Sequence, residues 1–166
     1  MISIVETERL TLRTFTPEDA PFILELVNDP TFLENIGDKE VRNLEDAKKH
    51  ISKNIISSYS KNGYGAYIVI IKDTNEPIGM WGFFKRDQFE YADIGYAFLP
   101  EFTGKGFATE SSIAVLNYGM KQFKLKKVLA FTSLKNNLSG RLLEKIGLKF
   151  VKNIQYETEK VKLYST

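Results

Sequence analysis

The chain has 166 residues, of which 43% are hydrophobic, and its 23 Lys and Arg residues nearly balance its 21 Asp and Glu residues. This length suits a single domain over residues 1–166, and a net charge of +2 gives no argument for binding to nucleic acid or an anionic membrane. The absence of cysteine excludes a thiol nucleophile, cysteine–zinc sites and disulfides, and no metal site is indicated. No apolar run is long enough to span a bilayer, so we expect a cytoplasmic protein.

The first 43 residues predict a strand, a helix and a loop. Leu10 and Leu12 alternate with polar residues, which is typical of a half-buried strand. Residues 16–19, Thr-Pro-Glu-Asp, form a helix start with a cap, a proline and two acids. Residues 28–43 have no clear period and are predicted as a loop with a short turn around residues 32–36. Three apolar residues form the expected buried face of the helix: Ile23, Leu26 and Val27.

A second helix is predicted from Asn43, which with Asp46 forms a cap. Its apolar residues recur at spacing four: Ala47, Ile51, Ile55 and Tyr59. The only histidine, His50, lies one position off this stripe, which favours a surface position over a catalytic one.

The rest of the chain predicts an antiparallel meander followed by alternating helices and strands. Strands are expected at residues 66–72, 78–85, 91–99, 128–132, 150–154 and 161–164. One helix is expected over 106–123, and another from Asn136 with Leu138, Leu142 and Ile146 on its buried face. The predicted fold class is α/β (α+β): one mixed, mostly antiparallel central sheet flanked by about four helices.

The chain is organised around residues 99–111, where a strand leads through two glycines into a helix. Pro100 ends the strand because proline has no N–H for a sheet ladder. Gly104 and Gly106 permit a positive φ and a close ligand, and the helix start offers free N–H groups to an anion. No Walker A string is present, and Thr109 stands where a dinucleotide fingerprint has its third glycine. A turn without any ligand stays open as an alternative.

This loop and five further phrases resemble the GNAT (Gcn5-related) N-acetyltransferases. Residues 103–108 resemble the family's pyrophosphate loop, Arg/Gln-x-x-Gly-x-Gly/Ala, with Gly106 and Ala108 matching and Thr103 departing. The other phrases resemble the branch that includes ribosomal-protein-alanine N-acetyltransferases: Thr7–Arg13, Pro77–Gly79, Asp93–Tyr96, Asn136–Ser139 and Leu143–Leu148. All stand in the family's order, so the resemblance covers nearly the whole chain and implies the GNAT fold.

The resemblance implies transfer of an acetyl group from acetyl-CoA to a primary amine by direct attack on the thioester. It puts the pantetheine arm along Phe98 and Leu99, where two strands separate, with Asn136 contacting the arm. The N–H of Phe98 or Leu99 is the expected donor to the carbonyl oxygen. The cofactor loop expected to hold the pyrophosphate comprises Thr103, Gly104, Lys105, Gly106, Phe107, Ala108 and Thr109.

Two residues are expected to act in catalysis. Leu143 stands where many GNAT enzymes have a tyrosine acid, whereas Ser139 matches the serine of the ribosomal-protein branch and is expected to hydrogen-bond the leaving thiolate. Asp93 is the expected base, with Glu34, Glu90 or water alone as alternatives. An α-amine with a pKa near 8 is partly neutral at pH 7 and needs no strong base.

The amine acceptor is expected between the 28–43 loop, the strand around residues 81–83 and the hairpin near 153–158. Acidic residues there would favour a cationic amine: Glu34, Asp38 and Asp93. Three aromatic residues either line this site or belong to the core: Phe32, Tyr64 and Trp81. The acceptor is a protein N-terminus or a small amine such as a polyamine, an amino acid or an aminoglycoside, and the protein is a monomer or homodimer. The departures at Thr103 and Leu143 also leave open a CoA-binding module without turnover.

Overall fold

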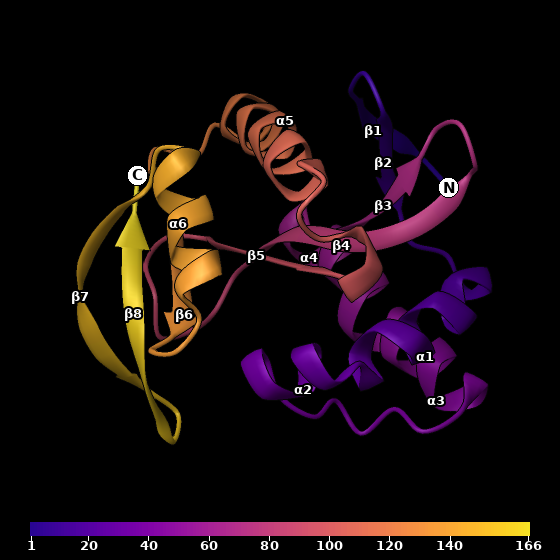
Figure 1. The fold of residues 1–166 in the computed structure, drawn as a ribbon, viewed down its shortest axis with the longest axis horizontal. Helices are drawn as coiled ribbons and strands as arrows, with labels where there is room; N and C mark the ends of the chain where they lie inside the picture. Colours follow the sequence, from indigo (N-terminus) through magenta and orange to yellow (C-terminus); the bar gives the residue numbers. More distant parts are fainter.

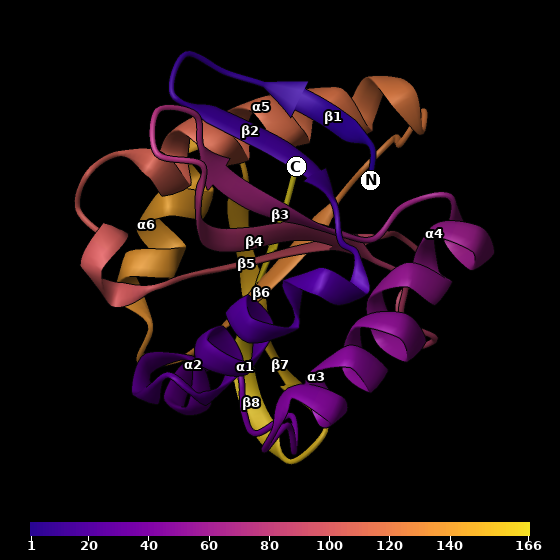
Figure 2. The ribbon, with the colours of Figure 1, turned by 90° about the vertical axis from the view of Figure 1, so that its right-hand side faces the viewer.

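The computed structural model describes all residues from Met1 to Thr166 and contains one eight-stranded sheet with helices on both faces (Figures 1 and 2). The strands lie in the order β1-β2-β3-β4-β5-β6-β8-β7, and every neighbouring pair is antiparallel except β5 with β6. Their bounds are β1 Ser3–Glu6, β2 Leu10–Thr14, β3 Ala66–Ile71, β4 Glu76–Phe84, β5 Asp93–Phe98, β6 Leu129–Ser133, β7 Lys149–Tyr156 and β8 Glu159–Ser165. The predicted mixed, mostly antiparallel sheet is thus confirmed. Only β1, a short edge strand without alternation, was not predicted.

Five helical bodies flank the sheet, where about four were predicted. The α-helices are α1 Ala20–Asn28, α2 Pro30–Asn35, α3 Leu44–His50, α4 Ser57–Asn62, α5 Phe107–Gln122 and α6 Asn137–Lys145. The π-helix η2, Ile51–Ile56, joins α3 to α4, so that residues 44–62 form one body. Two 3-10 helices, η1 Pro17–Asp19 and η3 Pro100–Phe102, precede α1 and follow β5. No helix is both long and apolar enough to cross a membrane.

Helix α2 overlaps the short turn that the sequence predicts around residues 32–36, and it is longer than that turn and begins earlier. Asp29 caps it by accepting hydrogen bonds from the N–H groups of Thr31 and Phe32, and Pro30 occupies its first position. A six-residue helix completes fewer than two turns, so it leaves no periodic pattern for sequence reasoning to detect.

The sheet separates two apolar clusters. Helices α5 and α6 cover one face and α1 with α3 the other, as Figures 1 and 2 show. The predicted buried faces of the first two helices are confirmed: Ile23, Leu26, Val27, Ala47, Ile51 and Ile55 are all buried. Of the two alternatives left open for three aromatic residues, the core position is the one that the structure shows: Phe32, Tyr64 and Trp81 are buried.

The expected buried face of α6 is only partly right, because Leu142 and Ile146 are half-buried but Leu138 is not. Leu138 is 78% exposed, whereas Leu143 is only 1% exposed and packs into the core. The reason is Gly140, where an added Cβ would lie 2.5 Å from the hydroxyl of Tyr164 on β8. The missing side chain lets the Tyr164 hydroxyl lie against α6, so Gly140 faces this ring.

Candidate active site

A gap opens in the middle of the sheet between β5 and β6. These parallel strands pair only at Asp93 with Leu129 and at Ile94 with Ala130. Beyond these pairs β5 continues for four residues and β6 for three without facing each other in the ladder. Backbone groups along both strands are therefore left for a ligand that can pair as a strand does, as expected from the sequence.

The loop from β5 to α5 presents unpaired backbone donors. None of the N–H groups from Gly104 to Thr109 donates a hydrogen bond within the chain. Gly104 and Gly106 have φ of +73° and +84°, a region that favours glycine. Six consecutive free amides at a helix N-terminus form a site suited to a pyrophosphate.

Side chains of this loop contribute less than its backbone. The Thr103 hydroxyl donates to Pro100 O at 2.7 Å, and the Lys105 ammonium lies over the Phe102 ring, exposed to solvent. The Phe107 ring is buried in the core, and Ala108 and Thr109 are half-buried in the first turn of α5. Of the loop side chains expected to bind the cofactor, only Lys105 presents a free charge to an anion.

Arg9, which sequence reasoning did not single out, braces this loop. Its guanidinium bonds the Glu110 carboxylate through Nε at 2.7 Å, donates to Lys105 O at 3.1 Å and stacks over the Phe107 ring at 4.4 Å. Glu110 also accepts from the Thr7 hydroxyl at 2.6 Å and the Arg9 N–H at 3.0 Å. Desolvation raises the pKa of Glu110, but these hydrogen bonds outweigh it and hold the pKa below its ordinary value. The phrase Thr-Glu-Arg was noticed in the sequence, but its contact with a residue about a hundred positions away was not predictable.

The two candidate oxyanion donors differ. Leu99 N donates to Ile78 O of the neighbouring chain segment at 2.9 Å, so of the two expected donors this one is already engaged. Because N–H directions alternate along an extended strand, the Phe98 N–H points the other way, toward the gap. Leu99 is buried, and Phe98 is the candidate that stays available.

Ser139 and Asn136 lie at the start of α6. Asn136 caps the helix by accepting from the Ser139 N–H at 3.1 Å, so the capping role is present and its amide nitrogen stays free of a partner. The Ser139 hydroxyl lies 2.7 Å from the Tyr96 hydroxyl on β5, and Tyr96 also donates to Ser139 O at 3.1 Å. Tyr96 was not predicted as a site residue, although it belongs to a phrase on which the resemblance rested.

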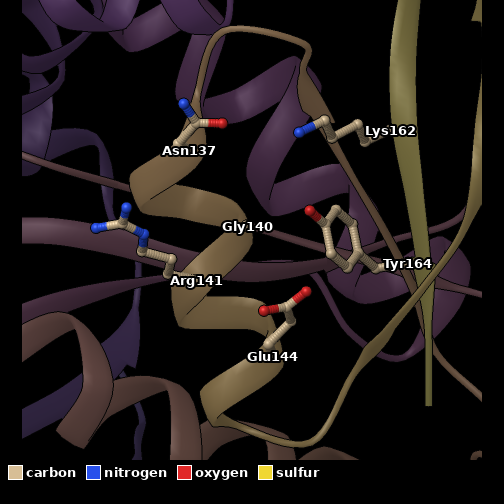
Figure 3. Close-up of a pocket in the computed structure, with 6 residues that line it drawn as sticks. All are labelled: Asn137, Gly140, Arg141, Glu144, Lys162 and Tyr164. Carbon is tan, nitrogen blue, oxygen red and sulfur yellow. The ribbon is translucent and has the colours of Figure 1, made fainter.

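Two further hydroxyls lie close to this end of α6. Thr132 on β6 is 6% exposed, and its Oγ1 makes no hydrogen bond of good geometry although the Tyr164 hydroxyl lies near it. Figure 3 shows the Tyr164 hydroxyl directed at Gly140 of α6. The hollow of about 190 Å³ drawn there lies between α6 and β8, on the side of the helix away from Ser139. A buried hydroxyl without a partner beside the gap is a position where a ligand group would be accommodated.

Asp93 does not face the gap as a free base. It is 1% exposed and accepts from Arg86 Nε at 2.9 Å, and Arg86 also donates to the Tyr156 hydroxyl at 2.9 Å. Burial raises the pKa of Asp93 to about 6 in spite of the opposing charge of Arg86. Asp93 lies five positions before Phe98, which is ~16 Å along an extended strand.

The expected acceptor region is only partly assembled. The β4–β5 connection and the final hairpin meet where Arg86 lies over an aromatic cluster: Phe89, Phe131 and Tyr156. Asp38 is held by Arg42 in its own loop, which lowers the pKa of this carboxyl to about 2. Glu34 and Glu90 are exposed and unpaired, and His50 is half-buried in α3 beside Asn54. The acids therefore do not converge on one point, and the sequence carried no signal for the aromatic cluster.

Comparison with known proteins decides the family. The family profile described as acetyltransferase (GNAT) domain matches residues 9–149. The chain belongs to the GNAT acetyltransferase family. This confirms the resemblance read from the sequence, and acetyl-CoA is the acetyl donor that the family uses.

Relatives of this GNAT chain are found among curated proteins and solved structures. The uncharacterized N-acetyltransferase YnaD of Bacillus subtilis is 31% identical over 145 residues, 87% of this chain and 82% of YnaD. The acetyltransferase (GNAT family) from Bacillus anthracis superposes with a TM-score of 0.80 at 28% identity, over 98% of this chain and 96% of that one. RimL, a ribosomal L7/L12 α-N-protein acetyltransferase in complex with CoA, has a TM-score of 0.86 at 20% identity, over 99% and 97% of the two chains. At that identity the likeness to RimL concerns the fold.

Proposed function

We propose that this GNAT enzyme transfers the acetyl group of acetyl-CoA to a primary amine by direct attack of the amine on the thioester. The observation that carries the proposal is the run of six free amides from Gly104 to Thr109 at the edge of the gap between β5 and β6. A turn without a ligand function would leave these donors to solvent, whereas a pyrophosphate satisfies several at once.

Each residue of the site has its own role in binding acetyl-CoA or in the transfer. The amides of residues 104–109 bind the pyrophosphate, with Lys105 adding a charge, and the Phe98 N–H faces the carbonyl oxygen as negative charge develops on it. Ser139 donates a hydrogen bond to the leaving sulfur, and Asn136 holds Ser139 in place through the helix cap. Acetyl-CoA supplies an activated acetyl group, and most of the rate comes from holding it in line with the amine.

The acceptor we favour is an α-amine, at a protein N-terminus or on a small molecule. RimL acts on a protein α-amine, and the aromatic cluster beside Arg86 offers an open, partly apolar surface next to the gap. An α-amine has a pKa near 8 and is partly neutral at pH 7, which suits a site whose buried carboxylate, Asp93, is paired with Arg86.

The test is CoA release measured with acetyl-CoA and a panel of acceptors: short peptides with free N-termini, amino acids, polyamines and aminoglycosides. We expect the fastest CoA release with an acceptor that carries an α-amine. Tight calorimetric binding of acetyl-CoA without turnover on any amine would instead favour the CoA-binding module that the sequence left open.

The pH profile separates the amine's own titration from a general base. With subsaturating acceptor, kcat/KM should rise with an apparent pKa near 8 for an α-amine, and Asp93→Asn should lower the rate without removing this rise. An apparent pKa near 6 that vanishes in Asp93→Asn would show that Asp93 acts as the base, in agreement with its raised pKa, and would contradict the mechanism proposed here.

A further inference from the structure

The hydroxyls of Tyr96 and Ser139 form a contact that joins the two sides of the gap. Tyr96 comes from β5 and Ser139 from the first turn of α6, 43 positions later, and their oxygens lie 2.7 Å apart. The Tyr96 hydroxyl also lies 3.1 Å from Ser139 O, so it is within hydrogen-bond distance of both oxygens of Ser139. Asn136 in turn accepts from the Ser139 N–H in the helix cap, so the hydroxyl is the group of Ser139 that a ligand can engage.

Two arrangements of the hydrogens satisfy these contacts. Each hydroxyl has a single hydrogen, and Ser139 O can only accept. Burial raises the pKa of Tyr96 to about 12, so the phenol stays neutral and keeps its hydrogen. Either hydroxyl can give the hydrogen of the 2.7 Å contact: when Tyr96 donates to Ser139 Oγ, the Ser139 hydrogen is free for a ligand, and when Tyr96 donates to Ser139 O, the Ser139 hydroxyl donates to Tyr96. A sulfur that gains negative charge favours the first arrangement, because only there does the Ser139 hydrogen reach it.

We propose that Tyr96 is a positioning residue that directs the Ser139 hydroxyl hydrogen at the sulfur of the bound thioester. This inference rests on the proposed function. In the reaction the amine nitrogen bonds to the carbonyl carbon, the carbon–sulfur bond breaks, and its electron pair stays on sulfur. The amine gives its proton to solvent, which also protonates the sulfur, while Tyr96 and Ser139 keep theirs. A hydroxyl that accepts one hydrogen bond also donates a stronger one, so Tyr96 strengthens the bond from Ser139.

The inference is tested on the binary complex, which needs no acceptor. A hydrogen bond to the charged form lowers the pKa of a titrating group, so the thiol of bound CoA should ionise at a lower pH than the thiol of free CoA. Calorimetry compares the affinity for CoA with that for desulfo-CoA, which lacks the thiol, from about pH 7 to about pH 10. For the unmodified protein we expect the ratio of affinities to rise by about threefold to tenfold, equal to a shift of about half a unit to one unit.

The variants isolate the contact. Tyr96→Phe, which removes only the hydroxyl, should lose most of the rise, Ser139→Ala all of it, and the double variant should match Ser139→Ala. With an acceptor that turns over, Tyr96→Phe should lower kcat about threefold to tenfold and leave KM for acetyl-CoA within about twofold. Tyr59→Phe is the matched control, because Tyr59 is also half-buried and hydrogen-bonded, to Ala66 O and Phe15 N, away from the gap. It should alter thermal stability but not the ratio.

Each other outcome has a distinct meaning. CoA binding with a ratio that does not rise, or a rise that survives in Tyr96→Phe, overturns this inference and leaves the proposed function standing. In the second case the helix N-terminus alone would account for the shift. Additive effects of the two substitutions would also overturn it, since independent residues do not act through one another. Failure of the folded protein to bind CoA would overturn both proposals.

Discussion

Replacement of Gly106 by valine is the sharpest test of the cofactor loop. Gly106 has φ +84° and ψ 0°, and an added Cβ would lie 3.3 Å from Arg9 Nη2. A side chain in the left-handed region costs roughly 1–2 kcal/mol, so the loop will relax and turn its amides away from their common direction. Loss of tenfold in affinity equals about 1.4 kcal/mol, and we expect Gly106→Val to bind acetyl-CoA at least tenfold more weakly.

Gly63 provides a matched control for this substitution. It ends α4 with φ +80° and ψ −5°, nearly the conformation of Gly106, and an added Cβ would meet nothing within 4 Å. Gly63→Val should therefore lower the stability by the same amount, which corresponds to a fall in Tm of roughly 2–8 °C. Its affinity for acetyl-CoA should not change. Isothermal calorimetry and thermal melts on both variants make the comparison. Unchanged affinity in folded Gly106→Val, or an equal loss in both variants, would refute the assignment of the pyrophosphate to this loop.

Three further predictions concern charge and packing. Arg9→Ala should weaken CoA binding by about fivefold because the carboxylate of Glu110 is left uncompensated beside the anion site, and adding Glu110→Gln should restore most of the calorimetric affinity. Between about pH 4 and pH 6 the folded protein keeps a proton on Asp93 that the unfolded chain releases, so stability relative to Asp93→Asn should fall by up to about 3 kcal/mol as pH rises. Urea titrations at about pH 4 and about pH 6 measure this change. A free energy of unfolding that rises with pH relative to Asp93→Asn would contradict the prediction. Gly119→Ala should cost about 1–3 kcal/mol or more in thermal melts, because its Cβ would lie 2.0 Å from Phe83 Cζ, and an unchanged Tm would count against this packing.

Elements with a strong period or a distinct cap were predictable from the sequence. The helix with Ala47 and Ile51 on its buried face and the helix start at residues 16–19 lie where their patterns put them. Helix α2 was predicted only as a short turn because it is too short to show a period. In α6 only Leu138 was misplaced, because Gly140 lies against Tyr164 and Leu143 turns into the core instead.

For the candidate site, the backbone features were more predictable than the side-chain contacts. Two glycines before a helix indicate free amides, and the structure has them at Gly104 to Thr109. The contact of Tyr96 with Ser139 and that of Arg9 with Glu110 join residues far apart in sequence, so no local pattern announces them. The ion pair that engages Asp93 comes from Arg86 in a turn, where a charged residue ordinarily means solvent exposure.

The brief pairing of β5 with β6 also has a mechanical consequence. The sheet has two parts, strands β1 to β5 and strands β6 to β8, and only two residue pairs between β5 and β6 join them. A ligand in the gap would form hydrogen bonds with the main chain of both parts and so connect them more firmly. We therefore expect bound CoA to slow amide hydrogen exchange in β6 as well as in β5. We also expect the two parts of the sheet to unfold as one cooperative unit when CoA is bound.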